Sequence, residues 1–168
     1  MKTRLAIALV IGGMLGTAFG FALGIFVYPF WFLTDVAAET VTDAATRTTL
    51  ASGRFVHANP SDPVHWGKGG VRILDGRDGG GRVVHLRSDF EVGPGPRFHV
   101  YLADRRDIRS NADFRAAVTL DLGRLRAFRG SQVYPVPAGV DLARIGSVVI
   151  WCKEFGVLIS PATLDRAG

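Results

Sequence analysis

The feature that most constrains this chain is an uncharged segment near its amino terminus. No Asp, Glu, Lys or Arg occurs from Leu5 to Leu33, a run of 29 residues that would extend about 43 Å as an α-helix. The hydrocarbon core of a bilayer is about 30 Å thick. Because the segment is apolar on every face, a buried core helix would need a much larger soluble domain around it. We therefore expect a membrane anchor in residues 1–33, with a tip at 1–4 and a span over about 5–33.

The residues that flank this span predict its orientation. Basic residues precede it and acidic residues follow it, so the positive-inside rule places the amino terminus in the cytoplasm and the rest of the chain outside the cell membrane. The basic residues are Lys2 and Arg4, and the acidic ones are Asp35, Glu39 and Asp43. The membrane is thus the first partner that the sequence predicts.

A cleaved signal peptide is the alternative, and it would leave a secreted or periplasmic domain. Lys2 and Arg4 would form its basic region, and Val36-Ala37-Ala38 offers small residues for a peptidase. The apolar core of a signal peptide, however, is only about 7–15 residues long. The run here is longer and ends in aromatic residues suited to a membrane interface, which favours an uncleaved single-pass signal-anchor. Those residues are Phe26, Tyr28, Phe30, Trp31 and Phe32.

Glycine recurs every four residues inside the span, at Gly12, Gly16, Gly20 and Gly24. Three consecutive GxxxG steps give one helix face a groove where another helix backbone can approach closely. The stripe predicts a homo-oligomer or lateral pairing in the membrane. Spans rich in Gly and Ala also occur without pairing, so the composition alone leaves both interpretations open.

The rest of the chain carries the whole net charge of +5, because the segment before Ala51 holds three basic and three acidic residues. Its basic residues alternate with acidic ones and form no basic helix, a distribution typical of a solvated mixed surface. We therefore expect no nucleic-acid partner. The single cysteine, Cys152, cannot form an internal disulfide. In an oxidising compartment it must be buried, liganded or paired with another chain.

Residues 34–52 are small and polar and read as a linker, with a helical continuation over 35–50 as one interpretation. After them come short apolar runs separated by turn residues, a pattern typical of an antiparallel all-β sandwich or barrel over 53–164. Asp78-Gly79-Gly80-Gly81 predicts a hairpin loop, and residues 107–117 a helical turn or two. The expected strands are 53–58, 70–74, 82–87, 98–102, 133–136, 147–152 and 156–159.

Several of these segments together resemble the DM-thirteen domain, also called the electron-transfer DM domain. They are Gly53-Arg54-Phe55, His65-Trp66-Gly67-Lys68-Gly69, Asp89-Phe90, Gly95-Pro96, His99-Val100-Tyr101-Leu102, Tyr134-Pro135-Val136-Pro137 and Val148-Val149-Ile150-Trp151-Cys152. The resemblance covers nearly all of residues 53–164. It implies an all-β extracytoplasmic domain whose single cysteine, Cys152 here, is proposed as a redox centre. Arg97 stands where family members commonly have an acidic residue, so any role of that carboxylate does not transfer.

Cys152 is the candidate redox thiol, and strand alternation places it inward with Val148 and Ile150. Free cysteine is often simple core packing, and a reactive thiolate needs a nearby cation or metal. Alternation places Phe98, Val100 and Leu102 on the core face and His99 and Tyr101 on the other.

Histidines on several segments would suit haem or copper as a cofactor, with His99 and His65 as candidate ligands. The C-x-x-C-H haem motif is absent, and scattered surface histidines explain the pattern equally well. No catalytic motif is present either, so a non-enzymatic protein is favoured.

Two functions follow from these observations. The first is an anchored electron-transfer or redox-adaptor module that works with an unidentified redox partner. The alternative is a cell-surface binding or adhesion module in which Cys152 is structural and the loops carry recognition.

Overall fold

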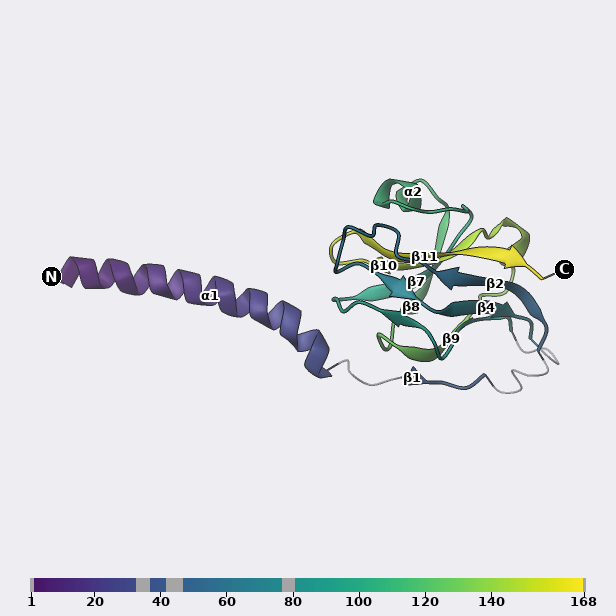
Figure 1. Cartoon of the computed structure of the whole chain (residues 1–168), viewed down its shortest axis with the longest axis horizontal. Coiled ribbons are helices and arrows are strands. Elements are labelled where there is room, and N and C mark those ends of the chain that lie inside the picture. The colour runs from purple at the N-terminus through teal and green to yellow at the C-terminus, as the bar shows by residue number, and fades with distance from the viewer. Residues whose placement is uncertain (1, 33–36, 42–46, 77–80, 168) are drawn as a thin grey trace.

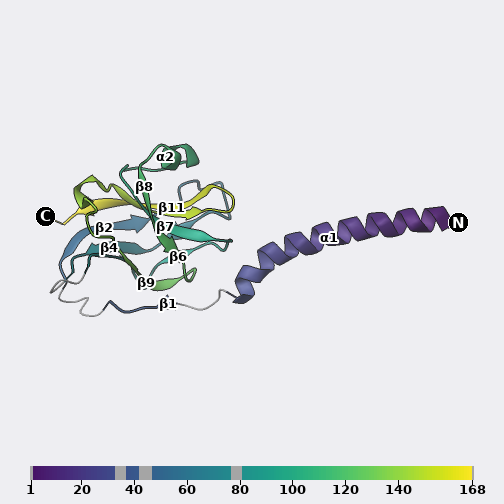
Figure 2. The same cartoon turned by 180° about the vertical axis from the view of Figure 1, so that it is seen from behind.

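The computed structural model describes residues 2–32, 37–41, 47–76 and 81–167, and the side chains of Lys2 and residues 28–32 are not described. Helix α1 (Lys2–Phe32) leads away from a β domain, as Figures 1 and 2 show. Within it, Thr3–Val27 is long and apolar enough to cross a bilayer and is not buried by the domain. Such a helix fits a membrane anchor and equally fits a signal sequence. The expected interfacial aromatics Tyr28, Phe30, Trp31 and Phe32 have side chains outside the described residues.

The domain is one curled nine-stranded sheet, a half-barrel, so of the two expected architectures the barrel-like one is found. Its strand order is β1-β9-β5-β4-β2-β11-β10-β7-β8, and every pair is antiparallel except β1 with β9. The strands are β1 (Ala37–Ala38), β2 (Thr49–Phe55), β4 (Gly70–Leu74), β5 (Val83–Leu86), β7 (Phe98–Ala103), β8 (Thr119–Arg124), β9 (Gly130–Pro135), β10 (Ser147–Cys152) and β11 (Val157–Arg166). A separate pair joins β3 (Gly67–Lys68) to β6 (Glu91–Val92).

The sheet has apolar side chains on both faces near its centre, and this explains why β10 is buried along its whole length. Its inner face belongs to the main core, which fills the half-barrel with Val148, Ile150 and Cys152 among others. Its outer face carries Val149 and Trp151, which pack under the short helix α2 (Asn111–Arg115). The expected strand 147–152 and the expected faces of β7 and β10 are therefore confirmed.

Helix α2 lies within the predicted helical region 107–117. Ser110 caps it by accepting from the Asp113 backbone amide at 3.2 Å, and its Phe114 ring stacks on Trp151 at 4.2 Å between centroids. This packing closes the second apolar cluster on the outer face of the sheet.

The segment 34–52 differs from the expected linker, because it contains strands where it is described. β1 adds to the edge of β9, and β2 begins at Thr49, before the expected domain start at 53. A helical continuation over 35–50 is wrong for the described residues, since 37–38 and 49–50 are strands and 39–41 and 47–48 are not helical. The loop predicted at residues 78–81 lies largely outside the described residues, but β4 and β5 on either side of it do form the expected antiparallel pair.

Candidate functional site

Cys152 is the last residue of β10 and lies at one end of the half-barrel. It pairs with Phe98 of β7 on one side and with Val157 of β11 on the other. Only 1% of its surface is exposed. Its thiol donates a hydrogen bond to the Pro96 carbonyl oxygen at 3.2 Å. The local sequence therefore places the sulfur beneath the loop that leads into β7.

That loop, residues 93–97, is shaped by its small residues. A Cβ atom on Gly95 would lie 2.4 Å from the Phe98 ring, and one on Gly93 would lie 2.4 Å from the Val64 carbonyl oxygen. Glycine is required at both places because the neighbouring atoms already occupy that space. Arg97 closes the loop with a left-handed backbone conformation, φ +46°, and its carbonyl oxygen accepts from the Lys153 amide at 3.2 Å.

The surroundings of Cys152 keep its thiol protonated at neutral pH. Burial raises its pKa, and the charge of Glu154 acts in the same direction. Backbone amides of Phe155 and Glu154 and the charge of Arg97 oppose this rise without cancelling it. Arg97 and Glu154 also pair with each other at 3.3 Å. The site therefore lacks the dominant cation that produces a reactive thiolate.

A cleft of about 440 Å³ opens beside Cys152, between the domain and the end of α1. Its walls are formed by four parts of the chain: α1 near Phe21 and Ile25, the 64–65 segment, the 94–98 loop, and Cys152 with Phe155 and Val157. The lining is apolar except for the Cys152 thiol and the His65 side chain. The volume lies within the range of small-molecule sites, about 300–1,000 Å³.

His65 belongs to this cleft and is held by a turn that starts at Asp62. Its Nδ1 atom lies 2.7 Å from an Asp62 carboxylate oxygen, and Asp62 also accepts from the Val64 amide at 2.9 Å and the His65 amide at 3.1 Å. The hydrogen bond from the His65 side chain and these backbone bonds lower the pKa of Asp62 to about 2. The carboxylate thus stays charged and orients the imidazole. Asp62-Pro63 is a turn signal in the sequence that would have indicated this contact.

His99 does not share the site with Cys152. It pairs with Trp151 across β7 and β10, which places it on the opposite face of the sheet. Its Nδ1 atom contacts both carboxylate oxygens of Asp121, at 2.9 and 3.0 Å, and Lys153 contacts Asp121 at 3.1 Å. Burial alone would raise the pKa of Asp121, but hydrogen bonds from His99, the Gly123 amide and Lys153 lower it. This group is a surface ion cluster.

The structure therefore brings His65 and Cys152 to one cleft and separates His99 from both. Among the described residues, no three His, Cys, Asp or Glu side chains come together as a metal site. The expected residues do not bring together the donor set that copper needs, and the cleft that His65 lines does not include His99. We derive no chemistry through either cofactor.

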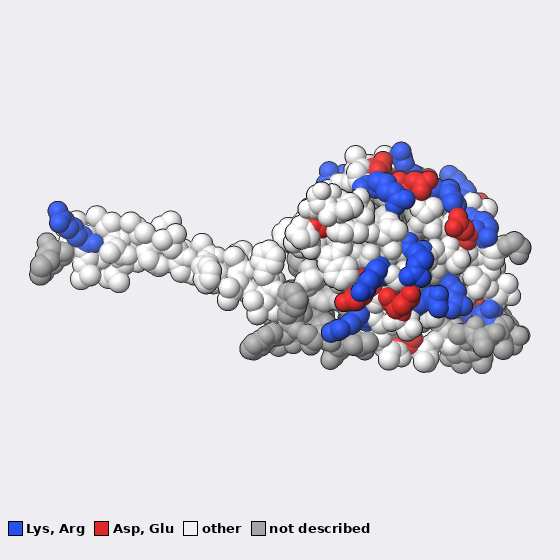
Figure 3. Space-filling model, in the orientation of Figure 1, with Lys and Arg blue, Asp and Glu red and all other residues white. Residues whose placement is uncertain are grey.

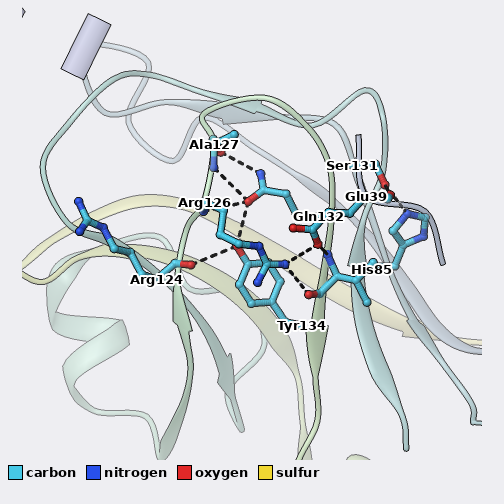
Figure 4. A network of polar contacts seen from close by, with 9 residues as sticks. Glu39, His85, Arg124, Arg126, Ala127, Ser131, Gln132 and Tyr134 are labelled. Atoms are coloured by element: carbon cyan, nitrogen blue, oxygen red, sulfur yellow. Dashed lines mark hydrogen bonds and ion pairs between the residues drawn. The ribbon is translucent and has the colours of Figure 1, made fainter. Parts of the chain in front are cut away.

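A polar network around the buried Gln132, which sequence reasoning missed, ties the linker to β9 and to the connection between β8 and β9 (Figure 4). Glu39 accepts from Arg126 at 2.6 Å and from the Val133 amide at 2.8 Å, and its own carbonyl oxygen accepts from the Ser131 hydroxyl at 2.5 Å. Gln132 is fully buried and bonds to the backbone of Arg126 and Ala127 and to the Tyr134 hydroxyl. The network fixes β1, and with it the chain that leaves α1.

Basic and acidic side chains are intermixed on the domain face shown in Figure 3. Examples of the pairs in the domain are Lys68 with Glu91 at 2.9 Å and Arg54 with Asp89 at 3.5 Å. In α1, the glycines Gly12, Gly16, Gly20 and Gly24 have open space where a Cβ would stand. Their pairing with a second span stays a prediction.

These features define a class: an all-β, half-barrel domain that follows an apolar helix and holds a single cysteine at an apolar cleft. Comparison with known families then identifies the family within this class. Residues 60–164 match the family described as Electron transfer DM13, which covers more than half of the chain, and the chain belongs to this family. No curated protein and no solved structure matches the chain. The resemblance stated from the sequence is thus confirmed, and the family description links the domain to electron transfer.

Proposed function

We propose that this protein is a membrane-anchored, extracytoplasmic electron-transfer module in which Cys152 and its cleft contact the redox partner. One observation carries the proposal: the only cysteine of a domain from an electron-transfer family lies on the wall of an apolar cleft of about 440 Å³. A buried cysteine used only for packing would not need an open cleft beside it.

Anchoring is supported by the length of α1 and by the charges around it. Arg4 lies near the start of the helix and Glu39 follows it, which by the positive-inside rule directs the domain outward. None of the Thr3–Val27 segment is buried by the domain, so its apolar side chains are available to lipid. An uncleaved anchor keeps the domain at the outer surface of the cell membrane, whereas cleavage would release it.

The raised pKa of Cys152 restricts the chemistry that the cleft can perform. A protonated, buried thiol reacts slowly with soluble disulfides and oxidants, because the thiolate is the reactive form. Cys152 is therefore suited to contact with an apolar partner that enters the cleft. It is not suited to open thiol–disulfide exchange.

The test is electrochemistry on the full chain, purified in mild detergent from its native host, together with its absorbance spectrum and metal content. We expect a reversible redox wave from the redox group that co-purifies with the chain. Cys152→Ala changes the wall of the cleft that contacts this group and should abolish the wave. Val148→Ala is the matched control, because it removes buried atoms from the same strand and the same core face without touching the thiol. An unchanged wave in Cys152→Ala would refute a redox role for this residue.

A binding or adhesion module with a structural cysteine is the second candidate. The nearly complete burial of Cys152 and its hydrogen bond to Pro96 favour it. It predicts no redox wave in the parent chain and a loss of stability in Cys152→Ala. The same two variants therefore separate the two functions.

A further inference from the structure

The cleft beside Cys152 lies at the end of the domain that faces the anchor helix. Phe21, Ala22, Ile25 and Phe26 of α1 line it, and all four belong to the 25-residue apolar segment Thr3–Val27. That segment is about 37 Å long as a helix, whereas about 20 residues cross the hydrocarbon core. Under the proposed function, these four residues lie in the outer part of the bilayer and its interface.

A short tether keeps the domain close to that surface. Only residues 33–36 separate the end of α1 from β1, so the chain reaches at most about 18 Å between Phe32 and Ala37. β1 is held in turn by its pairing with β9 and by the contacts of Glu39. The domain therefore cannot move far from the membrane without breaking these contacts.

The rim of the cleft has exposed apolar side chains. Phe155 is 57% exposed and Val64 is 41% exposed, although both belong to a domain with a well-filled core. Large apolar side chains left in water at one end of a domain mark a contact with an apolar partner. Since the anchor lies against the same cleft, the bilayer is the apolar phase that this rim meets.

Two polar groups stand inside the otherwise apolar lining. The Nδ1 atom of His65 contacts Asp62, so its Nε2 atom is the nitrogen left for a ligand. As a neutral imidazole this atom accepts a hydrogen bond from a hydroxyl, and as an imidazolium it donates one to a carbonyl. The Cys152 thiol lies on the same wall. A ligand that fits has an apolar ring with an oxygen that exchanges between hydroxyl and carbonyl.

We propose that this cleft binds the ring of a lipophilic quinone or quinol that enters from the bilayer. The inference rests on the proposed function, since anchoring brings the cleft to the membrane and the family is one of electron transfer. His65 contacts the ring oxygen, the 94–98 loop and Phe155 cover the ring, and the isoprenoid or alkyl tail stays in the lipid beside α1.

The test uses the full chain in lipid nanodiscs and a photoreactive azidoquinone, with labelled peptides mapped by mass spectrometry. We expect labelling within residues 64–65, 94–98 and 155–157 that a decyl-substituted benzoquinone displaces. Val64→Trp fills the mouth of the cleft and should weaken binding at least tenfold. Val118→Trp is the matched control: Val118 is also exposed but does not line the cleft, so its affinity should stay within about twofold of the parent.

His65→Phe separates recognition of the oxygen from recognition of apolar bulk. It keeps a ring of similar size and removes the hydrogen-bonding nitrogen, so quinone affinity should fall about tenfold. Labelling by a photoreactive fatty alcohol of matched chain length should not change. Equal displacement of the azidoquinone by decanol would overturn the proposal in favour of a simple acyl-chain slot, and labelling outside the cleft would also overturn it.

The outcome can be distinguished from that of the proposed function. A redox wave that depends on Cys152, found in a chain that does not bind quinone, would refute this inference and leave the proposed function intact. Quinone binding at the cleft without a wave that depends on Cys152 would support the inference and refute the redox role of the cysteine.

Discussion

Gln132 and Cys152 both place a polar side chain on the inner face of the curled sheet, but their surroundings differ. Gln132 is fully buried, and its amide makes four hydrogen bonds with protein atoms. The Cys152 thiol donates one hydrogen bond, to the Pro96 carbonyl oxygen, and lies on the wall of an apolar cleft. The first region is closed and complete, whereas the second leaves room for another molecule. This contrast indicates that Gln132 stabilises the fold, and it supports our proposal that Cys152 belongs to a site.

Replacing Gln132 should have the largest effect on stability. Gln132→Leu leaves the amides of Arg126 and Ala127 and the Ala127 carbonyl without their partner, at a cost of about 3 kcal/mol or more in the free energy of unfolding. The Tyr134 hydroxyl keeps only its contact with the Arg124 carbonyl oxygen. Urea unfolding of the sheet domain, followed by tryptophan fluorescence, measures the cost. Ser160→Ala, which removes a single buried hydrogen bond to Val56, should cost about 1 kcal/mol. Equal losses for the two variants would contradict the role given to Gln132.

Truncation of Cys152 at the cleft should reduce the free energy of unfolding less than Gln132→Leu does. Cys152→Ala removes one buried heavy atom at the edge of an existing cleft and should cost about 0.5–1.5 kcal/mol, as the loss of a buried methyl group does. Cys152→Ser keeps a donor for the Pro96 carbonyl oxygen and should cost no more. The same urea titrations test this. A loss as large as that of Gln132→Leu would mean that the cysteine holds the fold together, and the contrast between the two regions would fail.

Acid should weaken the network side of the molecule before the cleft side. The pKa of His85 is lowered, chiefly by burial and further by Arg72 and Arg87, and its Nε2 atom contacts Ser131 at 2.9 Å. In the unfolded chain His85 binds a proton near pH 6.5, whereas in the folded chain it binds one only at lower pH. The free energy of unfolding should therefore decline as the pH falls below about 6.5. The loss should be less than about 1 kcal/mol after solvent screening.

Thermal unfolding across pH 7 to 5 measures this decline, and His85→Gln should flatten the curve. His57→Gln serves as the control, because it retains His85 and should retain the slope. A His85→Gln variant with an unchanged slope would show that another group carries the acid sensitivity.

The smallest effects should come from the two charges beside Cys152. Glu154 raises the pKa of the thiol and Arg97 lowers it, so Glu154→Gln should speed alkylation of the native thiol at pH 8 and Arg97→Gln should slow it. Because both charges are about half exposed, each change should be about twofold. Iodoacetamide kinetics monitored by mass spectrometry resolve such differences. Changes of the same sign in both variants would show that altered access to the cleft, and not charge, controls the thiol.

The contribution of the Cys152 thiol to stability should decrease at high pH. Its folded-state pKa is raised above that of the unfolded chain, so the stability it contributes is complete below the unfolded value near 9 and is lost as the pH rises through the folded value. Alkylation of the native chain should therefore begin at a higher pH than alkylation of the urea-unfolded chain, which supplies the reference in the same experiment.

Much of this molecule could be predicted from the sequence alone because local patterns carried the information. The uncharged run gave an apolar helix, and alternation in 98–102 and 147–152 gave both the strands and the faces of their side chains. Turn residues marked most of the other strands. β8 was not predicted, because it is an edge strand with exposed polar positions and a glycine at Gly123. β11 runs to Arg166, beyond the expected end at 159, since its neighbours β2 and β10 continue the pairing past Pro161.

The sequence by itself determined the apolar amino-terminal helix, the all-β class, the family and the inward direction of Cys152, since each depends on residue type and near-neighbour spacing. Only the tertiary structure decided which polar residues meet. His65 lines the same cleft as Cys152, whereas His99 lies on the other face of the sheet. Glu39 pairs with Arg126, 87 residues further along the chain. Such meetings depend on how the sheet curls and which strands become neighbours. Curvature and strand order arise from long-range pairing, which no local pattern encodes.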